Sequence, residues 1–260
     1  MLDYPSNLRI AVNNAVNAWV NFSQLPQEEK QLYAASNAFD GAGYEQKVGG
    51  KGVSNDHKEN FDITSSFTLK DVPAGATAQS FIDKAQKMAQ LLQPEITKIG
   101  NDIANAVGEP GLRAIGEASI KNYYIRFIHY PPTDIGETIG EAHVDHSGFT
   151  FHLYESTDGC ERLSPTTTEW LPFPVADGKM AAFGGMQLQL ATNGTIKALC
   201  HRISANEQTS SAGRFVVVCF VSLQGIPKYD RNTHGRLQQK EPGFNYNMSP
   251  GDFAKLFTTS

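Results

Sequence analysis

The sequence lacks the features of membrane, secreted and nucleic-acid-binding proteins. No uninterrupted apolar run approaches the ~20 residues that a membrane-spanning helix requires. The first residues contain no basic segment followed by an apolar stretch, so we expect no secretory signal. Lys and Arg number 22 against 27 Asp and Glu, which gives a net charge of −5, and the basic residues form no cluster. We therefore expect neither a membrane nor a nucleic acid as a partner.

Cysteine is also scarce in this chain. There are three cysteines, Cys160, Cys200 and Cys219, an odd number with no CxxC spacing. This count argues against a disulfide framework and against a zinc ribbon. Cys219 stands in a strongly apolar run and is predicted to be a small, buried hydrophobic residue. The cysteine content favours a reducing compartment, and we expect a cytoplasmic protein.

The N-terminal part of the chain has the patterns of a helical region. At 260 residues the chain is long enough for one large core and short for two full domains. Apolar residues recur at helical spacing over Leu8–Phe22 and over Ala78–Val107, which predicts two amphipathic helices. Leu25–Lys30 contains a proline followed by acidic residues, a signal for the start of another helix. Residues 40–60 are rich in glycine and are predicted to be an irregular loop.

Beyond residue 115 the sequence changes to short runs of β-branched and aromatic residues separated by turn residues. Strands of this length and spacing are typical of a β-sandwich or β-barrel. The predicted strands are Ile120–Tyr130, Phe149–Tyr154, Lys179–Phe183, Gln187–Ala191 and Arg214–Leu223. The fold class is therefore predicted to be α+β and mainly β. We expect one domain, with helical support over 1–115, a β core over 116–225 and a C-terminal extension over 226–260.

The most informative segment contains His143 and Asp145. On a strand, residues i and i+2 project from the same face, so this imidazole and this carboxylate would meet at one point. His201, among strand-like residues further along the chain, is the best candidate for a third ligand. The pattern predicts a metal site formed by His143, Asp145 and His201. The alternatives are an exposed strand pair at 143 and 145 and a core histidine at 201.

The ligand set favours Fe(II) over zinc. Two histidines and one carboxylate on one face of an octahedron leave three positions open, enough for a bidentate cosubstrate and O₂. Zinc is possible with the same ligands, although closed structural zinc sites usually have four protein ligands.

Several weak motifs occur in the order typical of one enzyme family. The chain resembles the isopenicillin N synthase-like branch of the Fe(II)/2-oxoglutarate-dependent oxygenases. The matching segments are Phe22 with Leu25-Pro26 and Glu28-Glu29-Lys30, Gly43-Tyr44, Lys58-Glu59-Asn60-Phe61-Asp62, Arg126 to Pro132, His143-Val144-Asp145 with Gly148 and Thr150, Trp170, Phe183-Gly184, Thr192-Asn193-Gly194 and His201-Arg202-Ile203. Together they cover most of the chain.

The resemblance implies a fold, two cofactors and a set of site residues. The fold would be a double-stranded β-helix (jelly roll) with an N-terminal helical layer. His143, Asp145 and His201 would bind Fe(II), and Arg214 would form a salt bridge with the distal carboxylate of 2-oxoglutarate. Tyr130 would give a hydroxyl to a cosubstrate or substrate carboxylate, although core packing is an equal alternative. The activity would be hydroxylation, desaturation or ring closure of a small organic substrate with O₂.

The sequence departs from the family pattern at three points. Val216 stands where the Arg-x-Ser motif has serine, so one hydrogen bond to 2-oxoglutarate is missing. Gly185 stands where the family has aspartate, and the chain is expected to begin at the first helix without the usual leading strand.

Two other functions stay open. Val216 would suit an Fe(II) oxidase that works without 2-oxoglutarate, as isopenicillin N synthase does, with Arg214 binding a substrate carboxylate. A jelly-roll binding protein without catalysis is the third possibility. Among the other histidines, His152 shares the strand parity of Thr150, so it lies either in the pocket or in a structural position. His57, His129 and His234 have no partner that the sequence reveals.

Overall fold

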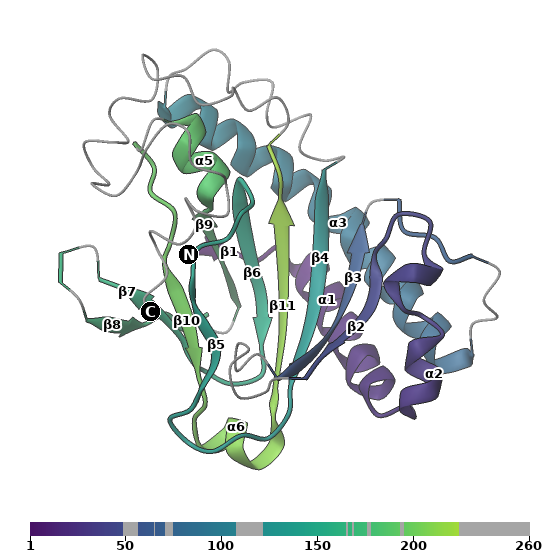
Figure 1. The fold of residues 1–260 in the computed structure, drawn as a ribbon. Coiled ribbons are helices and arrows are strands. Elements are labelled where there is room, and N and C mark those ends of the chain that lie inside the picture. The colour runs from purple at the N-terminus through teal and green to yellow at the C-terminus, as the bar shows by residue number, and fades with distance from the viewer. Residues whose placement is uncertain are drawn as a thin grey trace.

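The computed structural model describes residues 1–48, 57–64, 66–70, 75–107, 122–164, 166–167, 169–175, 178–192 and 195–223. In these ranges the chain forms two antiparallel sheets and a helical layer (Figure 1). The larger sheet has the order β1-β9-β6-β11-β4-β3-β2, and the smaller sheet has the order β5-β10-β7-β8. This arrangement confirms the predicted α+β, mainly β jelly roll.

The strands of the larger sheet come from distant parts of the chain. They are β1 (Leu2–Asp3), β2 (Gly43–Lys47), β3 (Lys58–Thr64), β4 (Tyr123–Tyr130), β6 (Phe149–Glu155), β9 (Lys179–Gly184) and β11 (Arg214–Val221). The smaller sheet consists of β5 (Thr138–His143), β7 (Cys160–Leu163), β8 (Trp170–Pro172) and β10 (His201–Ser204).

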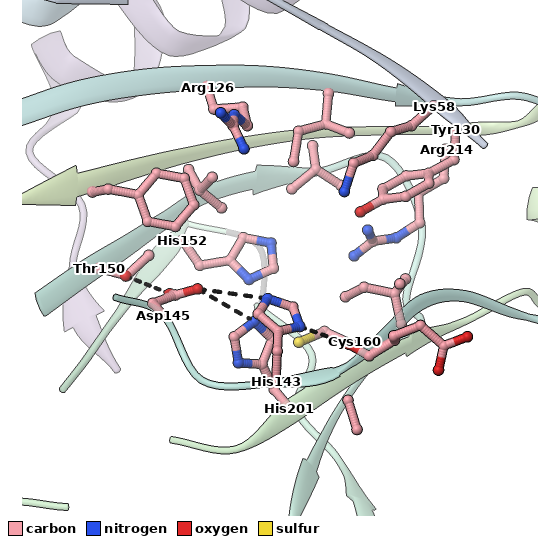
Figure 2. Close-up of a pocket in the computed structure, with 18 of the residues that line it drawn as sticks. Lys58, Arg126, Tyr130, His143, Asp145, Thr150, His152, Cys160, His201 and Arg214 are labelled. Carbon is pink, nitrogen blue, oxygen red and sulfur yellow. Dashed lines mark hydrogen bonds and ion pairs between the residues drawn. The ribbon is translucent and has the colours of Figure 1, made fainter. Parts of the chain in front are cut away.

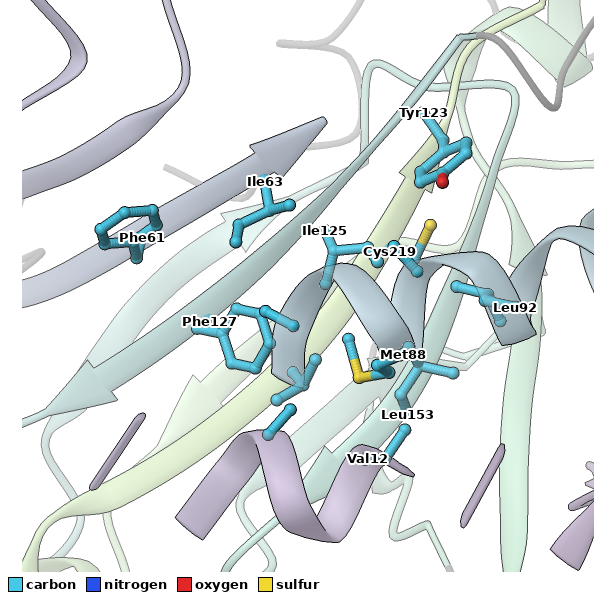
Figure 3. Close-up of a cluster of buried hydrophobic side chains, with 14 of the residues drawn as sticks. Val12, Phe61, Ile63, Met88, Leu92, Tyr123, Ile125, Phe127, Leu153 and Cys219 are labelled. Atoms are coloured by element: carbon cyan, nitrogen blue, oxygen red, sulfur yellow. The ribbon is translucent and has the colours of Figure 1, made fainter. Parts of the chain in front are cut away.

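Two long helices cover the outer face of the larger sheet. These are α1 (Ser6–Ser23) and α3 (Ala76–Val107), and they confirm the two predicted amphipathic helices. Their buried stripes include Val12 on α1 and Met88 and Leu92 on α3, which lie over the apolar side chains of the sheet (Figure 3). The shorter helices are α2 (Gln27–Gln31), which starts after Pro26 as predicted, the 3-10 helix η1 (Ala35–Asn37), α5 (Met186–Ala191) and α6 (Glu207–Ala212).

The central strands β4 and β11 place different side chains on the two faces of the larger sheet. Phe127 on β4 and Cys219 on β11 point toward the helices and are fully buried, which confirms the prediction for Cys219. Ile128 on β4 and Val216 on β11 point the other way, toward the smaller sheet. Because alternate residues of a strand lie on opposite faces, each strand supplies both the core and the space between the sheets.

A β-bulge interrupts the pairing of β6 with β11. Val217 lies opposite Tyr154, whereas Val218 lies opposite His152, so Leu153 is the extra residue. The bulge reverses the strand parity after Leu153. His152 and Glu155 therefore both lie on the face that looks toward the smaller sheet.

Three local predictions are wrong. Part of the 40–60 segment forms β2 and β3, because Phe61 and Ile63 alternate with polar residues and pack into the core. The predicted strand Gln187–Ala191 is part of helix α5. The alternation of Gln and Leu suggested a strand because the segment is too short to reveal helical spacing. Leu2–Asp3 pairs with β9 as strand β1, so a leading strand is present before α1.

The predicted extension over 226–260 lies outside the described residues. Of the helices in the described ranges, none combines the length and the apolar character that crossing a bilayer requires.

Candidate metal centre

A cavity of about 300 Å³ lies between the two sheets. Its walls include the inward-facing residues of β4 and β11 and the ends of β5 and β10. The five residues predicted for the site, His143, Asp145, His201, Arg214 and Tyr130, all line it (Figure 2). Tertiary structure thus brings together side chains that are up to 84 positions apart in the chain (214 minus 130).

The side chains of His143, Asp145 and His201 form a compact group. The Oδ1 atom of Asp145 lies 3.6 Å from Nε2 of His143 and 4.0 Å from Nε2 of His201. One ligand atom from each residue lies within 4.8 Å of the other two. Two atoms bound at about 2.1 Å to the same ion can be up to about 4.2 Å apart, so both Asp145–His separations fit a shared metal ion.

The two imidazoles are oriented by their own backbone. Nδ1 of His143 lies 2.6 Å from the carbonyl oxygen of Glu141, and Nδ1 of His201 lies 3.1 Å from that of Leu199. A proton on each Nδ1 leaves the lone pair of Nε2 directed at the shared point, as metal-binding histidines require. Burial and the neighbouring His201 ring lower the pKa of His143, which favours the neutral form that binds metal.

Asp145 is held in place by hydrogen bonds on both sides. Thr150 Oγ1 donates to Asp145 Oδ2 at 2.5 Å, which leaves Oδ1 facing the two histidines. The backbone N–H of Met186, in the first turn of α5, donates to the Asp145 carbonyl at 2.7 Å. The N–H of Gln187 donates to the carbonyl of Ser147 at 3.1 Å. The helix that the sequence predicted as a strand therefore supports the loop that carries Asp145.

The pairing of β5 with β10 brings the histidines together. His143 is the last residue of β5 and lies opposite His201, the first residue of β10. Asp145 lies in the loop between β5 and β6, so the prediction that it shares a strand with His143 is wrong. The two side chains meet because the chain turns back on itself here.

Arg214 is the most buried charged residue of the cavity. It has no solvent-exposed surface, donates from Nη2 to Glu155 Oε2 at 2.6 Å and donates from Nε to the Thr157 carbonyl at 3.1 Å. Its Nη1 is buried without a hydrogen-bond partner. Tyr130 lies opposite Arg214 in the pairing of β4 with β11 and also lines the cavity. Arg214 is thus a buried residue of the cavity wall and not a surface residue.

Two residues near Arg214 were not assigned from the sequence. His152 lines the cavity, is 3% exposed and has a buried Nε2 without a hydrogen-bond partner. Burial, the Arg214 guanidinium and the neighbouring His201 lower the pKa of His152 to about 3. Glu155 lies behind both residues, and burial raises its pKa although Arg214 opposes this. The sequence did not reveal the bulge at Leu153. Regular strand alternation would place Glu155 on the face opposite to that of His152, away from the cavity.

The rest of the wall combines cations and apolar rings. Arg126 lines the cavity and forms a two-point ion pair with Asp62, at 2.8 and 2.7 Å. Lys58 also lines the cavity, with Nζ 5.7 Å from the centre of the Tyr130 ring. Phe183 and Phe220 lie on its apolar part. This composition can hold a small molecule that has both apolar and polar groups.

The other histidines that the sequence left without a role are accounted for in part. His146 and His57 are exposed. His129 contacts Glu59 Oε1 through Nδ1 at 2.8 Å and stacks on Phe215. His234 lies outside the described residues.

Comparisons with known proteins agree on one superfamily. Residues 116–223 match the model of the 2OG-Fe(II) oxygenase superfamily. A 2-oxoglutarate-dependent dioxygenase of Didymella fabae is 31% identical over 103 residues, which are 37% of this chain and 30% of that protein. The alignment thus spans less than a third of the curated relative.

Solved structures share the fold at low sequence identity. A full-length Neurospora crassa protein, in complex with alpha-KG and 5-formyluracil, has a TM-score of 0.70 at 17% identity, over 86% of this chain and 73% of that one. A 2OG-Fe(II) oxygenase family protein of Caulobacter crescentus has a TM-score of 0.70 at 21% identity, over 89% and 85% of the two chains.

Proposed function

We propose that the protein is a non-haem Fe(II)- and 2-oxoglutarate-dependent dioxygenase, and the match of residues 116–223 to the model of the 2OG-Fe(II) oxygenase superfamily supports this proposal. The reaction would be hydroxylation, desaturation or cyclisation of a small organic substrate with O₂. The observation that carries the proposal is the convergence of His143, Asp145 and His201 around one point in the cavity. This donor set leaves coordination positions for a cosubstrate and O₂.

We assign His143, Asp145 and His201 as the iron ligands. When bound, iron together with 2-oxoglutarate and O₂ supplies the oxidising chemistry. The protein's part is to fix the ligands and to limit the access of water. Thr150 orients the Asp145 carboxylate, and the backbone carbonyls of Glu141 and Leu199 orient the two imidazoles.

We assign Arg214 and Tyr130 to the cosubstrate. The unpartnered Nη1 of Arg214 supports this assignment, because a buried guanidinium N–H without an acceptor is costly unless a ligand supplies one. A carboxylate is the natural acceptor for this group. Tyr130 lies opposite Arg214 across the strand pair, so its hydroxyl is our candidate for a second contact.

The proposal extends to the organisation of the chain. The contacts of α1 and α3 with the sheet support one oxygenase domain over 1–260, with the helical part as its support. A cytoplasmic location is likewise our proposal, supported by the small, odd number of cysteines, all three of which are buried.

Anaerobic titration tests the function. We expect the purified protein to retain Fe(II) and to give a metal-to-ligand charge-transfer absorption band when 2-oxoglutarate is added. In air it should convert 2-oxoglutarate to succinate. Asp145→Ala should lose both the band and the succinate, whereas Asp102→Ala on α3, remote from the cavity, should keep both. Retention of neither iron nor cosubstrate by the wild-type protein would contradict the proposal and favour a binding protein.

The second candidate is an Fe(II) oxidase that does not use 2-oxoglutarate. Two observations favour it: Val216 lines the cavity where a serine would give a hydrogen bond, and Arg214 is already paired with Glu155. In this case Arg214 would bind a substrate carboxylate, and the substrate would supply the electrons. Iron retention without a charge-transfer band and without succinate would select this alternative.

A further inference from the structure

Two buried nitrogen atoms in the cavity wall lack hydrogen-bond partners. They are Nη1 of Arg214 and Nε2 of His152. Both side chains line the same cavity, and both approach Glu155 Oε2, with Nη2 of Arg214 at 2.6 Å and Nε2 of His152 at 3.6 Å. Figure 2 shows the His152 ring above the group formed by His143, Asp145 and His201. Two unsatisfied nitrogens on side chains that line one cavity and share Glu155 as a neighbour indicate a position for an acceptor group.

The charges at this end of the cavity are already balanced before a ligand enters. Arg214 is compensated by the buried carboxylate of Glu155, which also accepts the backbone N–H of Val175 at 2.7 Å. A carboxylate that binds to Arg214 brings a second negative charge close to Glu155, next to side chains that are almost fully buried. Such a charge is costly without a further cation.

His152 is the group that can supply this cation. Its ring is neutral in the absence of ligand because burial, Arg214 and His201 disfavour its charge. A carboxylate between His152 and Arg214 would offset the effect of the guanidinium and favour a proton on Nε2. The protonated ring would then donate the hydrogen bond that Val216 cannot give.

On the basis of the proposed function, we propose that His152 is a positioning residue for 2-oxoglutarate: it takes up a proton when the cosubstrate binds and donates from Nε2 to the distal carboxylate. Val218, which lies opposite His152, and Val216, which lies opposite Glu155, are apolar and cannot do this. The titratable and charged groups that line the cavity around His152 are Lys58 on β3, Arg126 and Tyr130 on β4, Glu141 and His143 on β5, Asp145 after it, Cys160 on β7, His201 on β10 and Arg214 on β11.

Calorimetric titration of the Mn(II)-loaded protein tests this role without catalysis. Two ligands are compared: 2-oxoglutarate, and 2-oxobutyrate, which has the same 2-oxo acid end but no distal carboxylate. A hydrogen bond to a charged group contributes about 1.5–3 kcal/mol, so His152→Leu should weaken 2-oxoglutarate binding about 10- to 100-fold. Its affinity for 2-oxobutyrate should stay within about twofold, since this acid does not reach His152.

The number of protons taken up on binding is measured by repeating the calorimetric titration in two buffers of different ionisation enthalpy. Wild-type protein should take up as much as about one proton with 2-oxoglutarate, and His152→Leu should take up much less. Lys98→Met is the control, because Lys98 is exposed on α3 and does not line the cavity. It should leave the proton uptake and the selectivity between the two acids unchanged.

Several outcomes would overturn the inference. They are unchanged 2-oxoglutarate affinity in His152→Leu, equal weakening of both acids, no proton uptake by the wild type, or an equal loss of selectivity in Lys98→Met. The proposed function fails separately: if the metal-loaded wild type binds neither acid, both proposals are wrong. If it binds 2-oxoglutarate and His152→Leu binds it equally well, only the role of His152 is wrong.

Discussion

Thr150 illustrates how single residues prepare this site. Its hydroxyl donates to one oxygen of Asp145, and the other oxygen faces His143 and His201. Without this hydrogen bond the carboxylate could rotate about its terminal bond, and the proposed metal would lose a fixed ligand. Residues that orient ligands in this way contribute strongly to metal affinity.

We therefore expect Thr150→Val to weaken metal binding about 10- to 100-fold while the protein stays folded. The substitution keeps the shape of the side chain and removes only the donor. Mn(II) titration followed by calorimetry measures the change. The matched control is Thr97→Val on α3, whose hydroxyl donates to the Gln93 carbonyl far from the cavity; an equal loss of metal affinity there would contradict the role of Thr150.

At the scale of elements, the junction of β9 and α5 supports the loop that carries Asp145. A Cβ atom added to Gly185 would lie 2.3 Å from the Ser147 carbonyl oxygen and 2.9 Å from that of Asp145. The N–H of Gly185 also donates to the Gly148 carbonyl at 2.8 Å. This close approach explains why glycine, and not the aspartate of the family pattern, stands at position 185.

Gly185→Ala should displace the Asp145 loop, because backbone atoms cannot yield as a flexible side chain would. We expect metal affinity to fall about tenfold or more, with a destabilisation of about 1–3 kcal/mol. Metal titration and denaturant unfolding measure the two effects. Gly75→Ala is the control, since an added Cβ there would meet only the Tyr33 hydroxyl at 4.0 Å. Normal metal affinity in Gly185→Ala would show that the loop tolerates the shift.

At the scale of the whole molecule, a buried polar network joins the helical region to the larger sheet. Glu59 on β3 accepts hydrogen bonds from Lys30 on α2 at 2.6 Å and from Tyr44 on β2 at 2.7 Å, and it contacts His129 on β4 at 2.8 Å. Burial alone would raise the pKa of Glu59, but the three partners outweigh it and lower the pKa. The ionised carboxylate thus connects four elements.

This network predicts a specific acid sensitivity. Because the folded-state pKa of Glu59 lies below the unfolded value of 4.5, its contribution to stability is complete above that pH and is lost as the pH falls through the folded-state pKa. Glu59→Gln should lower the free energy of unfolding at pH 7 by about 3–5 kcal/mol, since Lys30 loses its buried partner. The variant should also lose less stability than the wild type below about pH 4.5.

Denaturant unfolding between pH 3 and pH 7 checks both parts. Glu45→Gln is the control, because Glu45 is about half exposed and its pair with Lys47 spans 4.0 Å; we expect a change of at most about 1 kcal/mol. Parallel pH profiles for wild type and Glu59→Gln would show that another carboxylate determines the acid limb.

The sequence by itself determined the elements whose pattern is local. Helical spacing predicted α1 and α3, and runs of β-branched and aromatic residues predicted β4, β6, β9 and β11. Ordered motifs predicted a resemblance to one enzyme superfamily and five site residues, and all five of these residues line the cavity. These signals are readable because each depends on residues a few positions apart, where backbone geometry alone fixes which side chains share a face.

Tertiary structure alone decided which distant side chains became partners. The register of β5 with β10 placed His201 opposite His143, and the bulge in β6 placed Glu155 behind Arg214. It also decided that His152 lies in the cavity wall with a free Nε2. Strand pairing over long sequence separations depends on the packing of the entire chain, so no local pattern records it, and the chemistry of this cavity depends on those pairings.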